Sequence, residues 1–342
     1  MDWSLAIAKA AVYSRIFATP MGLMRSVLLA GSESPWLRAQ ATRRAFVRRA
    51  VSRFMPGESL EDALGMVLTR LGESVTDAAE ADEVAAHYLD ALERIGPQQR
   101  GVRGGPQAPP AQIASADSFR ASEDAEISVK PTQLGLDIDA ARCVAHVRAL
   151  AERAAALGNF VWIDMEQSRY VDATLDLTRS VRARHANVGV CVQAYLFRTA
   201  QDLERLLPTG AGVRLVKGAY REPAETAFPR KADVDTNYLT LARRLLADDA
   251  RKAGVRAVFG THDTRLLRAI AESNAARGRP PGDAEFHLLY GIQRGEQRRL
   301  ARAGHTVRVL VSYGSYWFPW YMRRLAERPA NVWFVARSLF RA

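Results

Sequence analysis

Short apolar runs rich in β-branched residues alternate along most of the chain with longer segments whose apolar side chains recur every three or four positions. The short runs have the length and composition of β-strands, and the longer segments have the periodicity of amphipathic α-helices. Eight runs can be distinguished, the first being the weakest: Val67–Leu71, Glu126–Lys130, Phe160–Asp164, Val188–Gln193, Val213–Lys217, Ala257–Gly260, Glu285–Tyr290 and Thr306–Val311.

Two of the intervening segments show the helical pattern clearly. One helix is expected over Asp139–Leu157 and another over Leu239–Lys252, with these apolar faces: Val144, Val147, Leu150 and Ala151 in the first, and Leu239, Leu241, Ala242, Leu245 and Leu246 in the second. Eight strand–helix units predict an α/β fold, a distorted (β/α)8 TIM barrel with extra N-terminal helices. The competing architecture is a doubly wound open sheet. It normally shows a glycine-rich phosphate turn after an early strand, and none follows one here.

The chain divides unevenly around this repeating region. Residues 1–56 are predicted to form an N-terminal helical arm, and residues 57–342 a single flavin-binding catalytic barrel, as the motifs below indicate. Within the barrel, residues 97–124 are rich in Gly, Pro, Gln, Ala and Ser and lack apolar periodicity, which is typical of a flexible surface loop.

Cysteine content and hydropathy indicate the compartment. Cys143 and Cys191 lie in apolar patterns without metal-ligand neighbours, so we expect reduced thiols and no metal site. No apolar run reaches the roughly 18 to 20 residues of a membrane span. The N-terminus also lacks the pattern of a signal peptide. These features predict a cytoplasmic protein.

The net charge of +11 suggests an anionic partner. Clustered Lys and Arg with exposed aromatic residues are typical of nucleic-acid binding. Here the positive charge is mostly arginine and is spread over many predicted helices. The densest cluster, Arg43–Arg53, reads as the basic face of a helix. We therefore expect no nucleic acid, and we keep a peripheral contact with the inner membrane face as an alternative.

Polar side chains follow most of the predicted strands. Because a TIM barrel carries its chemistry at the C-terminal ends of its strands, these groups are expected to converge on one cavity. A single polar residue at a strand end is often only solvated, but seven strand ends make that account less attractive. They carry Lys130, Asp164, Gln193, Arg214 with Lys217 and Tyr220, His262, Tyr290 and Tyr313.

A further polar group lies near the C-terminus, in VSYGSYWFPWYMRRLAERPAN from Val311 to Asn331. Arg323 and Arg324 are adjacent, and paired guanidinium groups are well shaped to bind a carboxylate. Glu327, one helical turn after Arg324, can hold one of the arginines from the same face. The alternative is a solvated basic turn on an amphipathic helix.

Several segments together resemble bacterial monofunctional proline dehydrogenase: ISVKPTQLGLDID, VWIDMEQSRYVDATLDL, VRLVKGAYREPAE, FGTHD and the Tyr-Gly…RRLAERPAN tail. The resemblance covers roughly residues 45–340. It implies a distorted (β/α)8 barrel that holds FAD without a covalent bond. It also implies oxidation of L-proline to Δ1-pyrroline-5-carboxylate, by hydride transfer from proline C5 to flavin N5, as the first step of proline catabolism. Electrons would pass to a quinone or membrane acceptor, with a functional link to pyrroline-5-carboxylate dehydrogenase.

The resemblance also implies roles for individual residues. Lys130, Arg323 and Arg324 resemble the pocket for the proline carboxylate, Glu327 the partner that orients the arginine pair, and Asp164 the carboxylate that organises this network. Arg214 resembles the residue beside flavin N5, and Tyr220 an aromatic wall of the substrate site. The flavin contacts implied are Gln193, Arg214, Lys217, Gly218 and His262.

This chain departs from the family pattern at a few positions. Leu310 stands where many members have a tyrosine at the ring end of the proline site, Pro131 follows the pocket lysine, and His287 replaces a more usual glutamine. Two alternatives therefore stay open within enzyme chemistry. One is a related secondary-amine or hydroxyproline dehydrogenase. The other is a Schiff-base lyase or aldolase that uses Lys130 or Lys217 as its nucleophile.

Overall fold

A computed structural model of the chain describes residues 67–70, 75–96 and 125–313. In this part of the chain eight parallel strands close into a barrel in sequence order, so the predicted TIM barrel is confirmed. The strands are β1 (Val67–Arg70), β2 (Glu126–Val129), β3 (Val161–Ile163), β4 (Val188–Gln193), β5 (Gly212–Val216), β6 (Ala257–Gly260), β7 (Glu285–Leu289) and β8 (Thr306–Tyr313).

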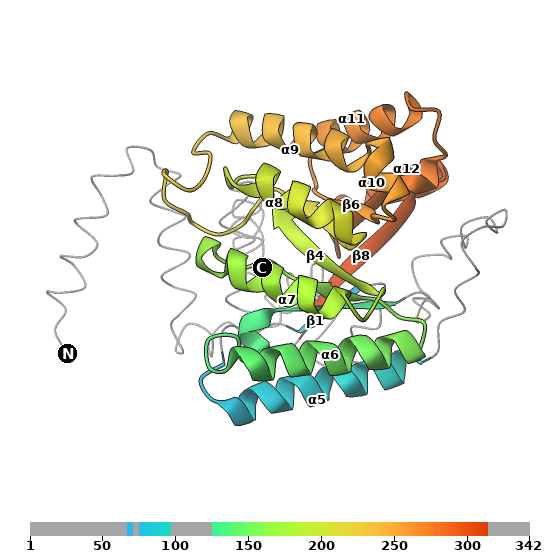
Figure 1. Ribbon diagram of the computed structural model, residues 1–342. Coiled ribbons are helices and arrows are strands. Elements are labelled where there is room, and N and C mark those ends of the chain that lie inside the picture. The colour runs from blue at the N-terminus through green and yellow to red at the C-terminus, as the bar shows by residue number, and fades with distance from the viewer. Residues whose placement is uncertain (1–66, 71–74, 97–124, 314–342) are drawn as a thin grey trace, which may run out of the picture.

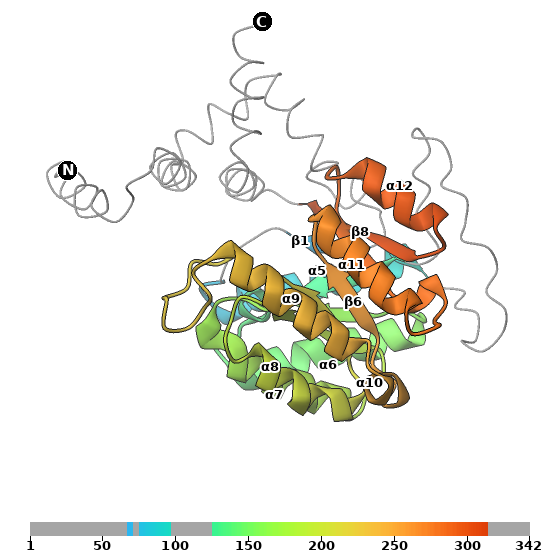
Figure 2. The same ribbon diagram turned by 90° about the horizontal axis from the view of Figure 1, so that it is seen from above.

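Helices cover the outside of the strands, with α5 and α6 lying side by side (Figures 1 and 2). The helices are α5 (Ala78–Ile95), α6 (Ala140–Ala156), α7 (Val171–Arg182), α8 (Thr199–Leu206), α9 (Lys231–Leu245), α10 (Asp248–Lys252), α11 (Thr264–Ala275) and α12 (Arg294–Arg302). Short 3-10 turns occur at η2 (Pro131–Leu134), η3 (Ser168–Tyr170), η4 (Leu207–Thr209) and η5 (Pro281–Asp283). The predicted arm over residues 1–56 and the loop over residues 97–124 lie outside the described residues.

Local sequence explains where α6 begins and why it packs. The carboxylate of Asp139 accepts hydrogen bonds from the backbone N–H groups of Ala141 and Arg142, at 2.9 and 3.1 Å, and so caps the first turn. Val147, Leu150 and other apolar residues on one face are fully buried against the barrel. The helix predicted over Asp139–Leu157 is therefore confirmed.

The helix predicted over Leu239–Lys252 differs from the structure. There α9 begins earlier, at Lys231, and ends at Leu245, and α10 begins at Asp248 after a break. Ala247 has an extended backbone at this break, with φ −71° and ψ 156°. Because Leu245 and Leu246 continue the apolar pattern without a Pro or Gly, the sequence gives no signal for the interruption.

Each strand of the barrel has two different faces, as β3 illustrates. Val161 and Ile163 are fully buried within the cluster that includes the outer helices, whereas Trp162 packs with residues of the interior. In β8 the same alternation directs Val309 and Val311 toward Ala91 of α5 and directs Leu310 toward Trp162 and Val258. The barrel interior is therefore filled by a set of side chains separate from the helix-packing core.

Charged side chains fill the N-terminal half of this interior. Glu126 of β2 and Glu285 of β7 are both buried, and Arg256 donates hydrogen bonds to both carboxylates. Arg308 of β8 adds a hydrogen bond of 2.9 Å to Glu285. Burial opposes ionisation of these carboxyls, but the arginines outweigh it and hold the pKa of Glu126 and Glu285 below the usual range. We call these four residues the charged floor.

Two further expectations can be checked on the described residues. Cys143 and Cys191 are both buried free thiols, as predicted. Among the described helices, none combines the length and the apolar character that crossing a membrane requires.

Candidate active site

Three of the predicted residues meet at the C-terminal end of the barrel. Arg214 of β5 donates a hydrogen bond to Asp164, which follows β3, and the ammonium of Lys130, which follows β2, lies 4.0 Å from the same carboxylate. Two positive charges therefore face one negative charge. Because these three side chains together carry a net charge of +1, the cluster is suited to bind an anionic group.

The guanidinium of Arg214 is held on one side and unsatisfied on the other. Its Nη2 donates to the hydroxyl of Ser128 at 2.7 Å, and that hydroxyl donates to Asp164 at 2.9 Å. Burial disfavours the charged form of Arg214, but the Asp164 carboxylate more than compensates and raises its pKa. Its Nη1 is buried and makes no hydrogen bond to the described residues. A buried donor of this kind is available to a water molecule or to a ligand.

The loops after β2 and β3 are fastened to each other by Glu166. Its carboxylate accepts hydrogen bonds from the backbone N–H of Thr132 at 2.9 Å and from the Thr132 hydroxyl at 2.7 Å. Burial raises the pKa of Glu166. Because Lys130 and Asp164 each lie two residues from this contact, it fixes the separation of these two charged side chains.

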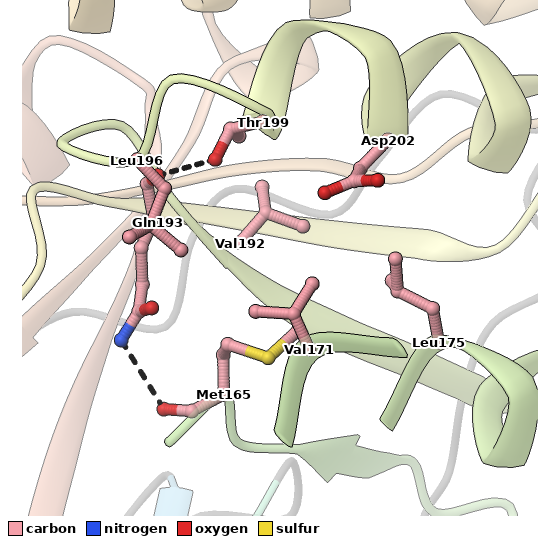
Figure 3. Close-up of a pocket in the computed structure, with 8 residues that line it drawn as sticks. All are labelled: Met165, Val171, Leu175, Val192, Gln193, Leu196, Thr199 and Asp202. Atoms are coloured by element: carbon pink, nitrogen blue, oxygen red, sulfur yellow. Dashed lines mark hydrogen bonds between the residues drawn. The ribbon is translucent and has the colours of Figure 1, made fainter. Parts of the chain in front are cut away.

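Gln193 ends β4 with its amide fixed in one orientation. The side-chain Nε2 donates to the carbonyl of Glu166 at 3.2 Å, and the dashed line in Figure 3 marks its longer contact with the Met165 carbonyl. The side-chain Oε1 is buried and accepts no hydrogen bond from the described residues. Gln193 therefore presents an acceptor, as Arg214 presents a donor.

A small cavity lies beside Gln193, between β4 and the helices α7 and α8 (Figure 3). Its volume is about 10 Å³, which is roughly the space of one water molecule. Most of the lining is apolar, from Met165, Val171, Leu175, Val192 and Leu196. The polar lining residues are Gln193, Thr199 and Asp202. A cavity of this size cannot hold an amino acid, so it is not the substrate site.

Lys217, which follows β5, lies in a network of charges. Its ammonium contacts the carboxylates of Asp235 in α9 and Asp263 before α11, the latter at 3.2 Å. Lys231 and Arg265 contact the same two carboxylates. Three cations against two anions again leave a net charge of +1 at the rim of the barrel.

The loop after Lys217 contains the predicted residues Gly218 and Tyr220. Gly218 has φ +110°, and a Cβ there would lie 2.2 Å from the ring of Tyr195, so only glycine fits. Tyr220 is partly buried in this loop. Further along the loop, Glu222 accepts a hydrogen bond of 2.8 Å from the backbone N–H of Ser168, which ties the loops after β5 and β3 together.

His262 and Leu310 are half-buried, as Lys130 and Asp164 are. The Nε2 of His262, which follows β6, accepts a hydrogen bond of 2.9 Å from the backbone N–H of Leu289. This bond ties the end of β6 to the end of β7. Leu310 faces the barrel interior, where it packs against Trp162 and Val258. The inward orientation of Leu310 is the one that its predicted place near the substrate requires.

The remaining predicted residues, Arg323, Arg324 and Glu327, lie outside the described part of the chain. Conversely, the structure adds Ser128 and Glu166, which the sequence analysis did not select. Ser128 could have been found, because it precedes Lys130 by two positions and so shares its strand face. Glu166 lies in a loop, where no periodicity identifies a side chain.

The architecture and the polar groups at the strand ends define a TIM-barrel enzyme. Comparison with known proteins then identifies its family, because a family model for proline dehydrogenase matches residues 57–337. Proline dehydrogenase 1 of Bacillus subtilis (strain 168) is 31% identical over 305 residues, which cover 86% of this chain and 92% of the relative. Proline dehydrogenase of Deinococcus radiodurans is 30% identical over 332 residues, with coverage of 93% and 98%. The chain belongs to the proline dehydrogenase family.

Solved structures agree on the fold. Proline utilization A (PutA) from Bdellovibrio bacteriovorus, inactivated by N-propargylglycine, matches with a TM-score of 0.71 and 22% identity over 92% of this chain. PutA from Bradyrhizobium japonicum, in its D779Y form, matches with a TM-score of 0.68 and 25% identity. This chain spans only 37% and 32% of those two longer proteins.

Proposed function

We propose that this protein oxidises L-proline to Δ1-pyrroline-5-carboxylate with FAD as its cofactor, the first step of proline catabolism. Membership of the proline dehydrogenase family, which is flavin-dependent, supports the reaction. The structural observation that carries the proposal is the cluster of Lys130, Asp164 and Arg214 at the mouth of the barrel. Its excess positive charge suits both a substrate carboxylate and a flavin that becomes more anionic on reduction.

The residues at the strand ends fit a flavin. The polar edge of a flavin ring carries hydrogen-bond acceptors and an N–H donor, and the site offers one buried unsatisfied donor on Arg214 and one buried unsatisfied acceptor on Gln193. The cationic network around Lys217 offers charge for the phosphates. Gly218, which excludes a side chain, supports close approach of a ligand to the backbone. FAD would accept the hydride that leaves proline C5.

The protein's own contribution is binding, orientation and charge. Lys130, with Arg323 and Arg324, is proposed to hold the proline carboxylate, and Glu327 to orient the arginine pair. Holding the carboxylate fixes where C5 lies, which converts a diffusive encounter into a positioned reaction. Asp164 keeps Lys130 and Arg214 close together despite their like charges. Tyr220 is proposed to form an aromatic wall, and His262 to contact the cofactor beside its bond to Leu289.

The test is an absorption spectrum of the purified protein before and after addition of L-proline without oxygen. We expect a flavin spectrum that bleaches on addition of L-proline and not of D-proline. Protein reconstituted with excess FAD that shows no flavin band would contradict the cofactor proposal. A flavin band that L-proline leaves unchanged would contradict the substrate instead.

A related secondary-amine or hydroxyproline dehydrogenase is the second candidate, and Leu310 is the observation that favours it. Its side chain faces the interior and offers an apolar contact without the hydroxyl of a tyrosine. Small apolar pockets discriminate by one group only on the order of 10- to 200-fold. We expect Leu310→Tyr to raise the ratio of kcat/KM for proline to that for 4-hydroxyproline. An unchanged ratio would show that Leu310 does not face the substrate ring.

The lysine-based lyase receives less support from the structure. Both of its candidate nucleophiles lie in ion pairs, Lys217 with Asp235 and Asp263 and Lys130 with Asp164, so neither amine is free to attack a carbonyl group. A quinone or membrane acceptor, a functional link to pyrroline-5-carboxylate dehydrogenase, and a cytoplasmic location at the inner membrane face complete the proposal. The net charge of +11 supports a location at the inner membrane face, where it would be attracted to anionic lipids.

A further inference from the structure

The indole ring of Trp162 crosses the interior of the barrel at a level where its neighbours have no side chains. Trp162 is in register with Gly189 of β4, which is in register with Gly212 of β5. A Cβ on Gly189 would lie 2.6 Å from Cζ3 of the indole, and a Cβ on Gly212 would lie 3.2 Å from Cη2. The first distance is too short for real atoms, and the second would force the indole to shift by a few tenths of an ångström. A Cβ on Gly212 would also lie 2.9 Å from Cζ of Phe160, so Gly189 leaves space for the indole and Gly212 leaves space for both rings.

The ring is also fixed in its orientation. The Nε1–H of Trp162 donates to Glu126 at 2.7 Å, and Glu126 is itself held by Arg256 of the charged floor. The ring of His287 packs edge-on against the indole, with centroids 5.5 Å apart and an interplanar angle of 79°. A fully buried aromatic ring with a bound N–H and filled edges has a single place to lie.

Arg214 rests on this fixed ring. The central carbon of its guanidinium lies 4.9 Å from the centroid of the Trp162 ring, within the range of a cation–π contact. On its other side Nη2 is held by Ser128 and Asp164, and Nη1 is left without an acceptor among the described residues. An arginine side chain has several rotatable bonds, so it presents a donor in a fixed direction only where its surroundings restrain it.

We propose that Trp162 is a positioning residue for Arg214, and that Gly189 and Gly212 reserve the space for its ring. The indole supports the guanidinium from below, so that Nη1 points to the ligand rather than toward the carboxylate of Glu126, which also attracts it. This inference rests on the proposed function, because it assumes that Arg214 acts on a bound flavin. Trp162 would thus act on the reaction without touching substrate.

The experiment compares the flavin midpoint potential, kcat and KM of the holoenzyme and its variants. In Trp162→Leu the cation–π contact is lost, and we expect about a tenfold weaker preference for the reduced flavin. For a two-electron couple this is a shift of about 30 mV to more negative potential. The kcat should fall by about tenfold while the KM for proline changes less than threefold. Trp162→Phe keeps part of the aromatic face, so its midpoint potential and kcat should lie between those of the parent protein and those of Trp162→Leu.

A second variant covers the case in which Trp162→Leu does not fold, and a third serves as the control. Gly189→Ala keeps the tryptophan but places a methyl group against its ring and against the carbonyl oxygen of Gly212, and it should shift the potential in the same direction. Phe259→Leu is the matched control, because Phe259 is equally buried but packs with the outer core. It should lower the melting temperature and leave the potential unchanged.

The outcomes distinguish the role of Arg214 from that of Trp162. If Arg214→Lys leaves the potential unchanged, the proposed role of Arg214 beside the flavin is wrong. If Arg214→Lys lowers the potential but Trp162→Phe and Gly189→Ala do not, the role of Trp162 is wrong and that of Arg214 stands. A shift in Phe259→Leu equal to that in Trp162→Leu would also overturn the inference, since general loosening would then explain both.

Discussion

His287 shows how the barrel interior determines the charge of a single residue. Its Nε2 donates to Glu285 at 3.0 Å, and its Nδ1 is buried without a hydrogen bond to the described residues. Burial lowers the pKa of His287 to about 4, although Glu285 works in the opposite direction. The neutral ring can therefore pack against Trp162 without adding a charge beneath Arg214.

This lowered pKa predicts a pH dependence of stability. The unfolded histidine, with a pKa near 6.5, takes up its proton first as the pH falls, so acid favours the unfolded state. Between about pH 7 and pH 5 this one group should cost about 2 kcal/mol of the free energy of unfolding. We expect His287→Gln to reduce the acid sensitivity by that amount, measured by urea unfolding at both pH values.

The control for this measurement is His185→Gln, in the turn after α7. It should leave the difference between the two pH values as in the parent protein. The difference should not vanish in His287→Gln, because burial also lowers the pKa of His87 and His305. Equal acid sensitivity in His287→Gln and the parent would show that His287 is not buried as described.

Single residues were predictable where a polar side chain lies at or near the C-terminal end of a strand, and not where an apolar residue fills the barrel interior. Lys130 and Asp164 follow from the rule that strand ends carry the chemistry, and the structure does bring them together with Arg214, which lies in the middle of β5. Trp162 read as an ordinary apolar member of its strand. Its position depends on glycines in two other strands, and no local pattern joins them.

At the scale of elements, turns depend on how closely two backbones approach. Gly210, before β5, has φ +64°, and a Cβ there would lie 2.4 Å from the carbonyl oxygen of Ala253. Gly278, after α11, has nearly the same backbone conformation, φ +65°, but a Cβ there would meet nothing within 4 Å. The two glycines therefore separate backbone strain from steric overlap.

The pair gives a direct prediction. Gly278→Ala should cost about 1–2 kcal/mol, the usual penalty of a left-handed backbone for a residue with a Cβ. Gly210→Ala should cost about 1–3 kcal/mol more, because the added methyl group overlaps a backbone oxygen that cannot rotate away. Urea unfolding of both variants measures the difference. Equal losses would mean that the chain around Ala253 yields without cost.

The elements themselves were predicted well from the sequence. All eight strands fall within two residues of the predicted runs at their described ends, because buried parallel strands are continuous apolar segments. The break between α9 and α10 was missed, since the apolar pattern continues through Leu246. No Pro or Gly lies between Leu245 and Asp248, so no breaker residue marks the interruption.

At the scale of the whole molecule, the charged floor joins strands that are distant in sequence. Arg256, before β6, bridges Glu126 of β2 and Glu285 of β7. All three side chains are almost completely buried, so each charge depends on the others for compensation. The sequence did not predict this cluster, because no local pattern in β2 identifies Arg256, 130 residues away, as the partner of Glu126.

Removing the bridging cation should therefore be severe. Arg256→Met leaves two carboxylates with only Arg308 to compensate them, and we expect a loss of about 3–5 kcal/mol in the free energy of unfolding. Arg244→Met is the matched control. Arg244 also bridges two carboxylates, those of Glu204 and Asp249, but on the surface, where the loss should be slight. Similar losses in both variants would show that the floor is open to water.

The floor also bears on the order in which the protein is made. Glu126 leaves the ribosome 130 residues before Arg256, and Glu285 follows before Arg308 completes the set. Until then a closed interior would trap an uncompensated carboxylate, which costs several kcal/mol. The nascent strands must therefore keep that end hydrated, so the barrel closes only after its last strand has been synthesised. A fragment containing the first half of the barrel lacks the cations it needs and cannot serve as a stable half-domain.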